Sequence, residues 1–312
     1  MSNINTTDTL LGIDIGSTTA KVVLQQGGEI TFRSYERHFS QVRTKTLEIL
    51  ARIKDLIGNK PVKVAISGSA GLGLAEAAGL PFVQEVFATG ETVKALEPDT
   101  NVVIELGGED AKVIFFDGGA DERMNGTCAG GTGAFIDQMA TLLDLTTDEM
   151  DQLSLTATRI YPIASRCGVF AKTDVQPLLN QGAAKSDIAA SIYRAVVNQT
   201  IAGLAQGRRI AGKVLFLGGP LSFLMGLRRQ FVEVLGLSPE NAVFPDYGPV
   251  SVALGASFYA AGLSGSFTYD NLVRHIEQAA QNITGSVRLA PLFADEREYA
   301  SFAARHGGKR EP

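Results

Sequence analysis

Two stretches of this 312-residue chain repeat one pattern. "DIGSTTAKVVL" begins at Asp14 and "ELGGEDAKVIF" begins at Glu105. Aligned without gaps, both read acid, aliphatic residue, glycine, three variable residues, alanine, lysine, valine and two hydrophobic residues. Each copy predicts a strand, a glycine turn and a second strand. Two copies of such a unit predict two similar domains that face each other.

Strand and helix patterns alternate along most of the chain, which predicts the α/β class. At roughly 150 residues per domain, the chain is long enough for two domains. We expect the first domain over residues 10–100, completed by the helical pattern near 250–263. The second is expected over 101–249 and carries both cysteines. The polar residues 264–312 are expected to form a C-terminal extension or linker.

Composition narrows the possible partners and compartments. The hydrophobic share of 45% and the charged share of 20% are typical of an ordinary globular protein. A net charge of -5 leaves no dominant basic surface, which argues against nucleic acid as a partner. No apolar run approaches the ~20 residues of a membrane span, and the first residues lack a signal-peptide pattern. We therefore expect a cytoplasmic protein with no membrane partner.

Each repeated turn has the chemistry of a phosphate site. Glycine lets the backbone approach a ligand closely, and backbone N–H groups with the hydroxyls of Ser17, Thr18 and Thr19 can bind phosphate oxygens. A carboxylate at the strand end, Asp14 or Glu105, can hold hydrated Mg²⁺. Two plain glycine hairpins are the alternative. The second copy and the later turn "FLGGP" favour a nucleotide bound between the hairpins.

The three glycine turns together resemble the superfamily of actin, sugar kinases and heat-shock chaperone ATPases. The resemblance implies an actin-like, ribonuclease H-like α/β fold, with two duplicated domains around a nucleotide cleft. It implies that the two hairpins bind the phosphates of ATP or ADP with Mg²⁺, and that the third turn contacts adenosine. Asp14 and Glu105 would be catalytic, although much of the superfamily has aspartate where Glu105 stands. The implied nucleotide-binding residues are Gly16, Ser17, Thr18, Thr19, Lys21, Gly107, Gly108, Glu109, Asp110, Gly218, Gly219 and Pro220.

Three further features have two interpretations each. The "GTG" of Gly131, Thr132 and Gly133 could approach the nucleotide or only shape the turn before a helix. Lys21 and its counterpart Lys112 could screen phosphate charge or could lie on a solvated face. Glu85 could point into the cleft or could be a solvated or capping residue.

The chain has only two cysteines, Cys128 and Cys167, and both precede predicted helices. A helix N-terminus favours the thiolate form. Inert buried thiols and a nucleophile with a distant partner are both possible, and two thiols leave a zinc site incomplete. An iron–sulfur cluster normally needs four thiolates, which a two-fold homodimer would supply. The spacing alone leaves these alternatives open.

The cysteine motifs resemble a more specific family. "MNGTCAGGTGAFIDQMA" and "YPIASRCGVFAKTDVQPLLNQGA" are similar to the two cysteine motifs of the ATP-dependent activators of 2-hydroxyacyl-CoA dehydratases. These activators belong with the ATPase subunits of benzoyl-CoA reductase. The resemblance extends from about Leu11 to Leu263. "VVIELGGEDAK" resembles most closely the first activator module of long fused CoA-substrate-specific enzyme activases, in which glutamate is usual at this position.

This resemblance implies a function. It implies a C2 homodimer with one [4Fe-4S] cluster bridged by Cys128 and Cys167 of both subunits. ATP hydrolysis would drive a low-potential electron to an iron–sulfur reductase or an (R)-2-hydroxyacyl-CoA dehydratase, with a ferredoxin or flavodoxin-type donor. Two rivals share the fold. A small-molecule kinase would transfer phosphate without needing the cysteines, and a nucleotide-switched binding module would show negligible turnover.

Overall fold

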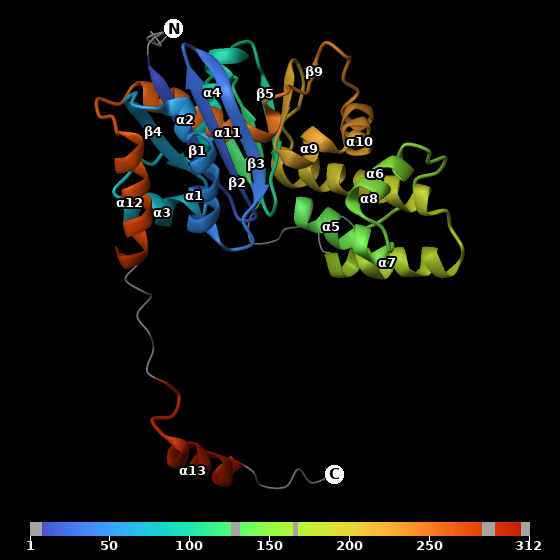
Figure 1. Cartoon of the computed structure of the whole chain (residues 1–312). Coiled ribbons are helices and arrows are strands. Elements are labelled where there is room, and N and C mark those ends of the chain that lie inside the picture. The colour runs from blue at the N-terminus through green and yellow to red at the C-terminus, as the bar shows by residue number, and fades with distance from the viewer. Residues whose placement is uncertain (1–7, 126–131, 165–167, 283–290, 307–312) are drawn as a thin grey trace.

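The computed structural model describes residues 8–125, 132–164, 168–282 and 291–306. Cys128, Gly131 and Cys167 lie outside the described residues. Two mixed β-sheets with flanking helices form the body of the molecule (Figure 1). The described residues include no helix long and apolar enough to cross a membrane.

The two sheets share the topology of their first four strands, and the second sheet adds β9 parallel to β8. The first has the order β3-β2-β1-β4 and the second the order β7-β6-β5-β8-β9. In each, three consecutive strands pair antiparallel, and a later strand pairs parallel with the first of them. The strands are β1 (Thr9–Ile15), β2 (Thr19–Gln26), β3 (Glu29–Arg37), β4 (Val62–Ser67), β5 (Val102–Leu106), β6 (Ala111–Phe115), β7 (Asp121–Met124), β8 (Val214–Leu217) and β9 (Ala242–Val243).

The sequence repeat is also a repeat of register. Asp14 at the end of β1 lies opposite Lys21 of β2, and Glu105 at the end of β5 lies opposite Lys112 of β6. The predicted strand, turn and strand are confirmed in both copies. Because each acid is the next-to-last residue of the first strand of its sheet, each lies at the edge where its glycine turn begins.

One face of the first sheet packs against four helices. They are α1 (Val42–Arg52), α2 (Lys54–Ile57), α3 (Gly71–Ala78) and α12 (Tyr269–Asn282). In α12, Leu272, Ile276 and Ala279 are buried in this core. The range 264–312, expected to be an extension or linker, thus contains a packed core helix, because these apolar residues recur on one helical face. Helix α13 (Glu296–His306) has no buried residue.

The other face of the first sheet packs against α11 (Ser251–Ala261). A Cβ on Gly12 of β1 would overlap the carbonyl oxygen of Ala253, so strand and helix meet at backbone contact. The helix predicted near 250–263 therefore packs on the first sheet. We call β1–β4 with α1–α3, α11 and α12 the first unit.

Helix α4 (Glu85–Leu96) lies between the two sheets. Its Ala88 packs against Gly255 of α11, where a Cβ would overlap the Ala88 carbonyl. Farther along the helix, Val93 is buried with Val103 and Ile114 of the second sheet. This helix therefore carries its first residue, Glu85, to the junction of the two sheets.

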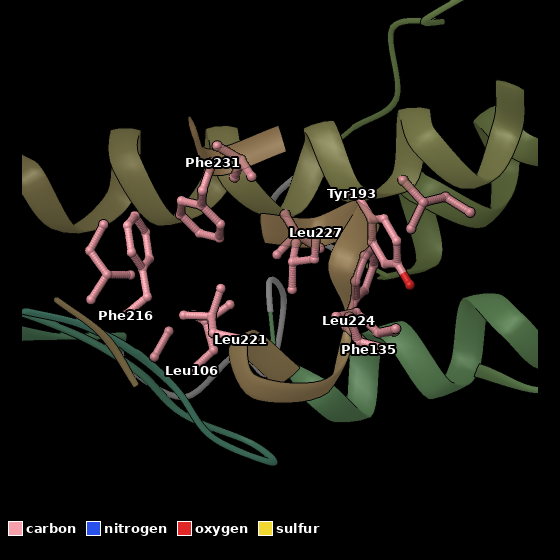
Figure 2. Close-up of a cluster of buried hydrophobic side chains, with 14 of the residues drawn as sticks. Leu106, Phe135, Tyr193, Phe216, Leu221, Leu224, Leu227 and Phe231 are labelled. Carbon is pink, nitrogen blue, oxygen red and sulfur yellow. The ribbon is translucent and has the colours of Figure 1, made fainter. Parts of the chain in front are cut away.

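The second unit comprises β5–β9 and the helices that cover them. A cluster of Leu106, Phe135, Tyr193, Phe216, Leu221, Leu224, Leu227 and Phe231 joins these helices to the sheet (Figure 2). It fixes the helices that border the candidate site. The helices are α5 (Gly133–Leu142), α6 (Thr147–Ser154), α7 (Gly168–Asn180), α8 (Lys185–Thr200), the π-helical turn Ile201–Ala205, α9 (Gly219–Phe223), α10 (Met225–Leu235) and the 3-10 turn Gly248–Val250.

Candidate active site

Two adjoining cavities lie between the two units. The front cavity has a volume of about 390 Å³ and is lined by Tyr35 and Arg37 of the first unit and by α5 and α9 of the second. The hairpin cavity is smaller and lies between the two repeated turns. Both cavities include Thr18, Thr19 and Gly108 in their lining, so one leads into the other.

Most of the residues predicted for the site line one of these cavities. Gly133, Gly219 and Pro220 line the front cavity. Glu109 lines neither but faces a third cavity behind the hairpins. The hairpin cavity is lined by Asp14, Gly16, Ser17, Thr18, Thr19, Lys21, Glu105, Gly107, Gly108 and Asp110 of the predicted set, together with Ser69, Glu85 and Lys112.

The first hairpin is held by contacts within its own unit. The Nζ of Lys21 lies 2.9 Å from Oδ2 of Asp14, and the Asp14 side chain is buried while that of Lys21 is partly buried. Burial lowers the pKa of Lys21, but Asp14 outweighs it and the pKa is raised. The N–H of Gly16 donates to the carbonyl of Thr19 at 3.0 Å. The ring of His38 contacts the carbonyl of Gly16 at 2.9 Å, a support that no local sequence signal predicts.

The second hairpin carries a larger charge network. Lys112 forms ion pairs with three carboxylates: Glu85 of α4, Asp110 at 2.7 Å and Glu105 at 3.6 Å. Burial lowers the pKa of Lys112, but these carboxylates outweigh it and hold the pKa well above its usual value. Burial also raises the pKa of Glu105 while Lys112 opposes the rise. Thr89 of α4 donates its hydroxyl to Oε2 of Glu105 at 3.2 Å.

The two hairpins approach each other so closely that glycine is required. A Cβ on Gly108 would overlap Oγ1 of Thr18 in the opposite hairpin. A Cβ on Gly107 would overlap the carboxylate of Asp110 within the same hairpin. The cavity between the hairpins is therefore narrow and lined by backbone, charged groups and hydroxyls, as a polyphosphate site requires.

The third glycine turn borders the front cavity. Gly218 has a φ of 88°, and a Cβ there would overlap the carbonyl of Leu106. It therefore shapes the turn from β8 into α9 and is absent from the front cavity's lining. Gly219 lies against the hydroxyl of Tyr35, whose ring meets Phe223 edge to face at 5.5 Å. These rings were not predicted as site residues, and they give this cavity an apolar wall.

An ion pair crosses the front cavity. Arg37 at the end of β3 donates to Oδ2 of Asp137 on α5 at 2.7 Å. The other oxygen of Asp137 accepts from the hydroxyl of Thr147, the first residue of α6, at 2.8 Å. Neither charge belongs to a glycine motif, so sequence reasoning had no signal for this pair.

Helix α5 is tied directly to the second hairpin. The N–H groups of Gly133 and Ala134 donate to the carbonyls of Gly107 and Gly108 at 3.0 and 2.7 Å. Thr132 is the N-cap residue of this helix and is fully buried. The segment that carries Cys128 leads into α5, so the helix that follows this cysteine begins on the second hairpin.

Helix α7 begins beside α5. A Cβ on Gly168, the residue after Cys167, would lie 3.6 Å from the ring of Phe135. The same position is 3.5 Å from Oε1 of Gln138. The two segments that carry the cysteines therefore lead into helices that touch near their N-termini. Among the residues that the structure describes, no group of three or more His, Cys, Asp or Glu side chains forms a metal site.

Comparison with known proteins shows where this architecture occurs. The family described as the BadF/BadG/BcrA/BcrD ATPase family matches residues 11–260. The (R)-2-hydroxyglutaryl-CoA dehydratase activating ATPase of Acidaminococcus fermentans is 33% identical over 258 residues, which cover 80% of this chain and 96% of that protein. The 2-hydroxyisocaproyl-CoA dehydratase activator of Clostridioides difficile is 28% identical over 256 residues, which cover 80% of this chain and 94% of that protein.

Solved structures agree with these matches. The crystal structure of component A of the (R)-2-hydroxyglutaryl-CoA dehydratase from Acidaminococcus fermentans superimposes with a TM-score of 0.72 at 28% identity. The superposition covers 85% of this chain and 99% of that one. The predicted actin-like fold and the predicted resemblance are both confirmed. The chain belongs to the BadF/BadG/BcrA/BcrD ATPase family.

Proposed function

We propose that this ATPase is a homodimeric, [4Fe-4S]-containing activator that drives low-potential electrons to a partner iron–sulfur reductase or (R)-2-hydroxyacyl-CoA dehydratase. The observation that carries the proposal is the pair of hydrogen bonds from Gly133 and Ala134 to the second hairpin. They connect the nucleotide site to the helix that follows Cys128. The names of the relatives, an activating ATPase and an activator, support the same role. We place it in the cytoplasm, with a ferredoxin or flavodoxin-type donor.

In this proposal ATP spans the two adjoining cavities. Adenosine lies in the front cavity against Gly219 and Pro220, beside the rings of Tyr35 and Phe223. The phosphates lie between the hairpins, where backbone N–H groups and the hydroxyls of Ser17, Thr18 and Thr19 bind their oxygens. Lys21 and Lys112 add positive charge at this end of the cleft.

Hydrolysis depends on the two acids that end β1 and β5. Both Asp14 and Glu105 line the hairpin cavity, and carboxylate oxygens with water are the ligands that Mg²⁺ prefers. We assign Asp14 to the hydrated metal and Glu105 to the attacking water. Thr89 orients the Glu105 carboxylate through its hydrogen bond. Backbone N–H groups of the hairpins stabilise the charge that develops on the phosphates.

The cysteines fit a cluster shared between two subunits. Each chain supplies two thiols, on segments that lead into the adjacent starts of α5 and α7. A two-fold pair of chains supplies the four thiolates that a [4Fe-4S] cluster needs, and helix N-termini suit an anionic group. Bound there, the cluster would supply a one-electron carrier of low potential. The chain's own part is to hold it with Cys128 and Cys167 and to move those segments.

Coupling needs two states with different affinity for ATP. Closure of the hairpins on ATP sets the distance between Thr18 and Gly108. Because Gly108 accepts a hydrogen bond from Ala134, a shift of the second hairpin moves the start of α5 with it. The nucleotide state is thereby transmitted to the segment that carries Cys128.

The test is purification without oxygen, followed by iron, sulfide and visible absorption measurements on the wild type and on Cys128→Ala and Cys167→Ala. The expected result is about four irons per two chains, with the cluster lost in each variant. Both variants should still bind ATP, since neither changes a hairpin. A wild type that assembles no cluster after reconstitution would contradict the proposal, and one cluster per monomer would contradict the shared site.

A further inference from the structure

A third cavity lies behind the hairpins. This rear cavity has a volume of about 520 Å³ and opens between α3 on one side and β6 and β7 on the other. It shares Ser17, Ser69, Glu85, Asp110 and Lys112 with the hairpin cavity. Within the described residues it shares no lining residue with the front cavity. The three cavities therefore form a series, with the hairpin cavity in the middle.

This order matters for the two products of ATP hydrolysis. In the proposed ATP site, the nucleoside diphosphate would fill the front cavity and reach between the hairpins, where Thr18 and Gly108 lie close together. Orthophosphate is formed at the inner end, with the diphosphate between it and the front opening. The cavity that adjoins the inner end is the rear one, through the residues that both cavities share.

An ion pair stands at the boundary between these two cavities. Glu85 at the start of α4 pairs with Lys112 of β6, and both residues line both cavities. Lys112 also pairs with Asp110, so its ammonium stays at the boundary if Glu85 moves away. Helix α4 packs on α11 and the second sheet, so rearrangement at the junction of the sheets alters this contact.

The side chains that line the rear cavity differ in charge and polarity between its inner and outer parts. Lys112 at the inner end can attract a phosphate dianion once Glu85 moves away, because the lysine then has fewer carboxylate partners. Glu109 and Glu122 line the cavity too, along with the exposed side chains of Leu72 and Met124. Acidic and apolar walls give a dianion no strong binding site. A phosphate that passes Lys112 is therefore released and not retained.

We propose that the rear cavity is the exit route for orthophosphate and that the Glu85–Lys112 pair is its gate. The inference rests on the proposed hydrolysis of ATP between the hairpins. It adds an order of events: orthophosphate leaves through the rear while the diphosphate still occupies the front. The contact between Glu85 and Lys112 then controls how long the protein holds both products.

The test uses substitutions on either wall that narrow the rear cavity. It measures ATP cleavage and orthophosphate release in one single-turnover reaction. Leu72→Trp adds bulk from α3 and Met124→Trp adds it from β7. Leu56→Trp is the matched control, because Leu56 on α2 is 43% exposed, as Leu72 is, and lines none of the three cavities. Quenched samples report cleavage, a fluorescent phosphate sensor reports release, and thermal unfolding checks that each variant folds.

The expected result is a delay of release behind cleavage, about tenfold longer than in the Leu56→Trp control, with the cleavage rate unchanged. Glu85→Gln should shorten the delay, because it removes the charge that pairs with Lys112. If both rear variants cleave ATP and release phosphate with no added delay, the exit route is overturned. A wild type that cleaves no ATP would overturn the proposed hydrolysis, a result distinguishable from failure of the exit route.

Discussion

The two repeated hairpins share their backbone register but differ in their connections. In the first, Lys21 pairs with Asp14, and the turn is held by His38 of the same unit. In the second, Lys112 gathers three carboxylates, one of them from α4. The second hairpin also accepts two hydrogen bonds from α5.

This difference shows how one duplicated unit acquires two tasks. The acid and the lysine are present in both copies, so both can serve phosphate and metal. The additional contacts of the second copy come from residues outside the repeat, namely Glu85, Thr89 and the start of α5. In the proposed function, the first hairpin would therefore be the fixed wall, and the second would connect hydrolysis to α4 and α5.

The largest expected effect separates the two acids. Glu105→Gln should lower kcat for ATP hydrolysis by roughly 10²–10⁴, the range for loss of a group that positions or deprotonates a nucleophile. Asp14→Asn should instead raise the Mg²⁺ concentration needed for half-maximal activity. Steady-state kinetics at several Mg²⁺ concentrations check both. Equal kcat losses with unchanged Mg²⁺ dependence would show that the acids are interchangeable.

The next effect separates the two lysines. Lys112→Met leaves Glu85, Glu105 and Asp110 together without their shared cation and should destabilise the fold by about 3–5 kcal/mol. Lys21→Met leaves a single carboxylate, Asp14, without its cation and should lower the free energy of unfolding by a smaller amount. Urea unfolding of the two variants measures the difference. A larger loss of unfolding free energy in Lys21→Met than in Lys112→Met would contradict this difference between the two hairpins.

The contact between the hairpins gives a smaller effect. Gly108→Ala would force a Cβ into Thr18, and we expect it to weaken binding of a non-hydrolysable ATP analogue by about 1–3 kcal/mol. Gly73→Ala on α3 is the control, since a Cβ there would meet nothing within 4 Å and Gly73 lines none of the three cavities. Calorimetric titration compares them, and equal affinities would argue against close apposition of the hairpins during binding.

The smallest effect tests the support for Glu105. Thr89→Val removes its hydrogen bond and should raise the barrier to hydrolysis by about 0.5–1.5 kcal/mol, seen as a lower kcat. Thr92→Val is the matched control for Thr89→Val. Thr92 is also buried on α4, but it donates its hydroxyl to the carbonyl of Ser251 at 2.7 Å. It should affect stability without changing kcat, and a loss of kcat in both variants would point to α4 as a whole.

The sequence predicted the parts of this site that are local. The repeat alone identified both hairpins, their acids and the duplicated sheets, because acid, glycine and lysine are fixed by strand register within a few residues. The α/β class followed from the alternation of patterns. Gly218 was predicted to bind the nucleotide, and that contact stays a prediction. Its positive φ and its close approach to Leu106 give it a structural part in the turn.

The connections between the parts could not be predicted in this way. Arg37 and Asp137 meet only because β3 and α5 face one cavity, and Glu85 meets Lys112 only because α4 lies between the sheets. Such pairs depend on packing between segments far apart in the chain, for which a single sequence has no periodic signal. Helix α12 was missed since its polar surface concealed the apolar stripe that enters the first core.

We propose that the nucleotide between the hairpins controls the cysteine segments through α5. The direct measurement is the rate at which a ferrous-iron chelator removes iron from the anaerobically purified protein with ADP and with a non-hydrolysable ATP analogue. We predict clearly different rates with the two nucleotides, and a smaller difference in Gly108→Ala at saturating nucleotide. Identical rates in the wild type with both nucleotides would contradict the claim.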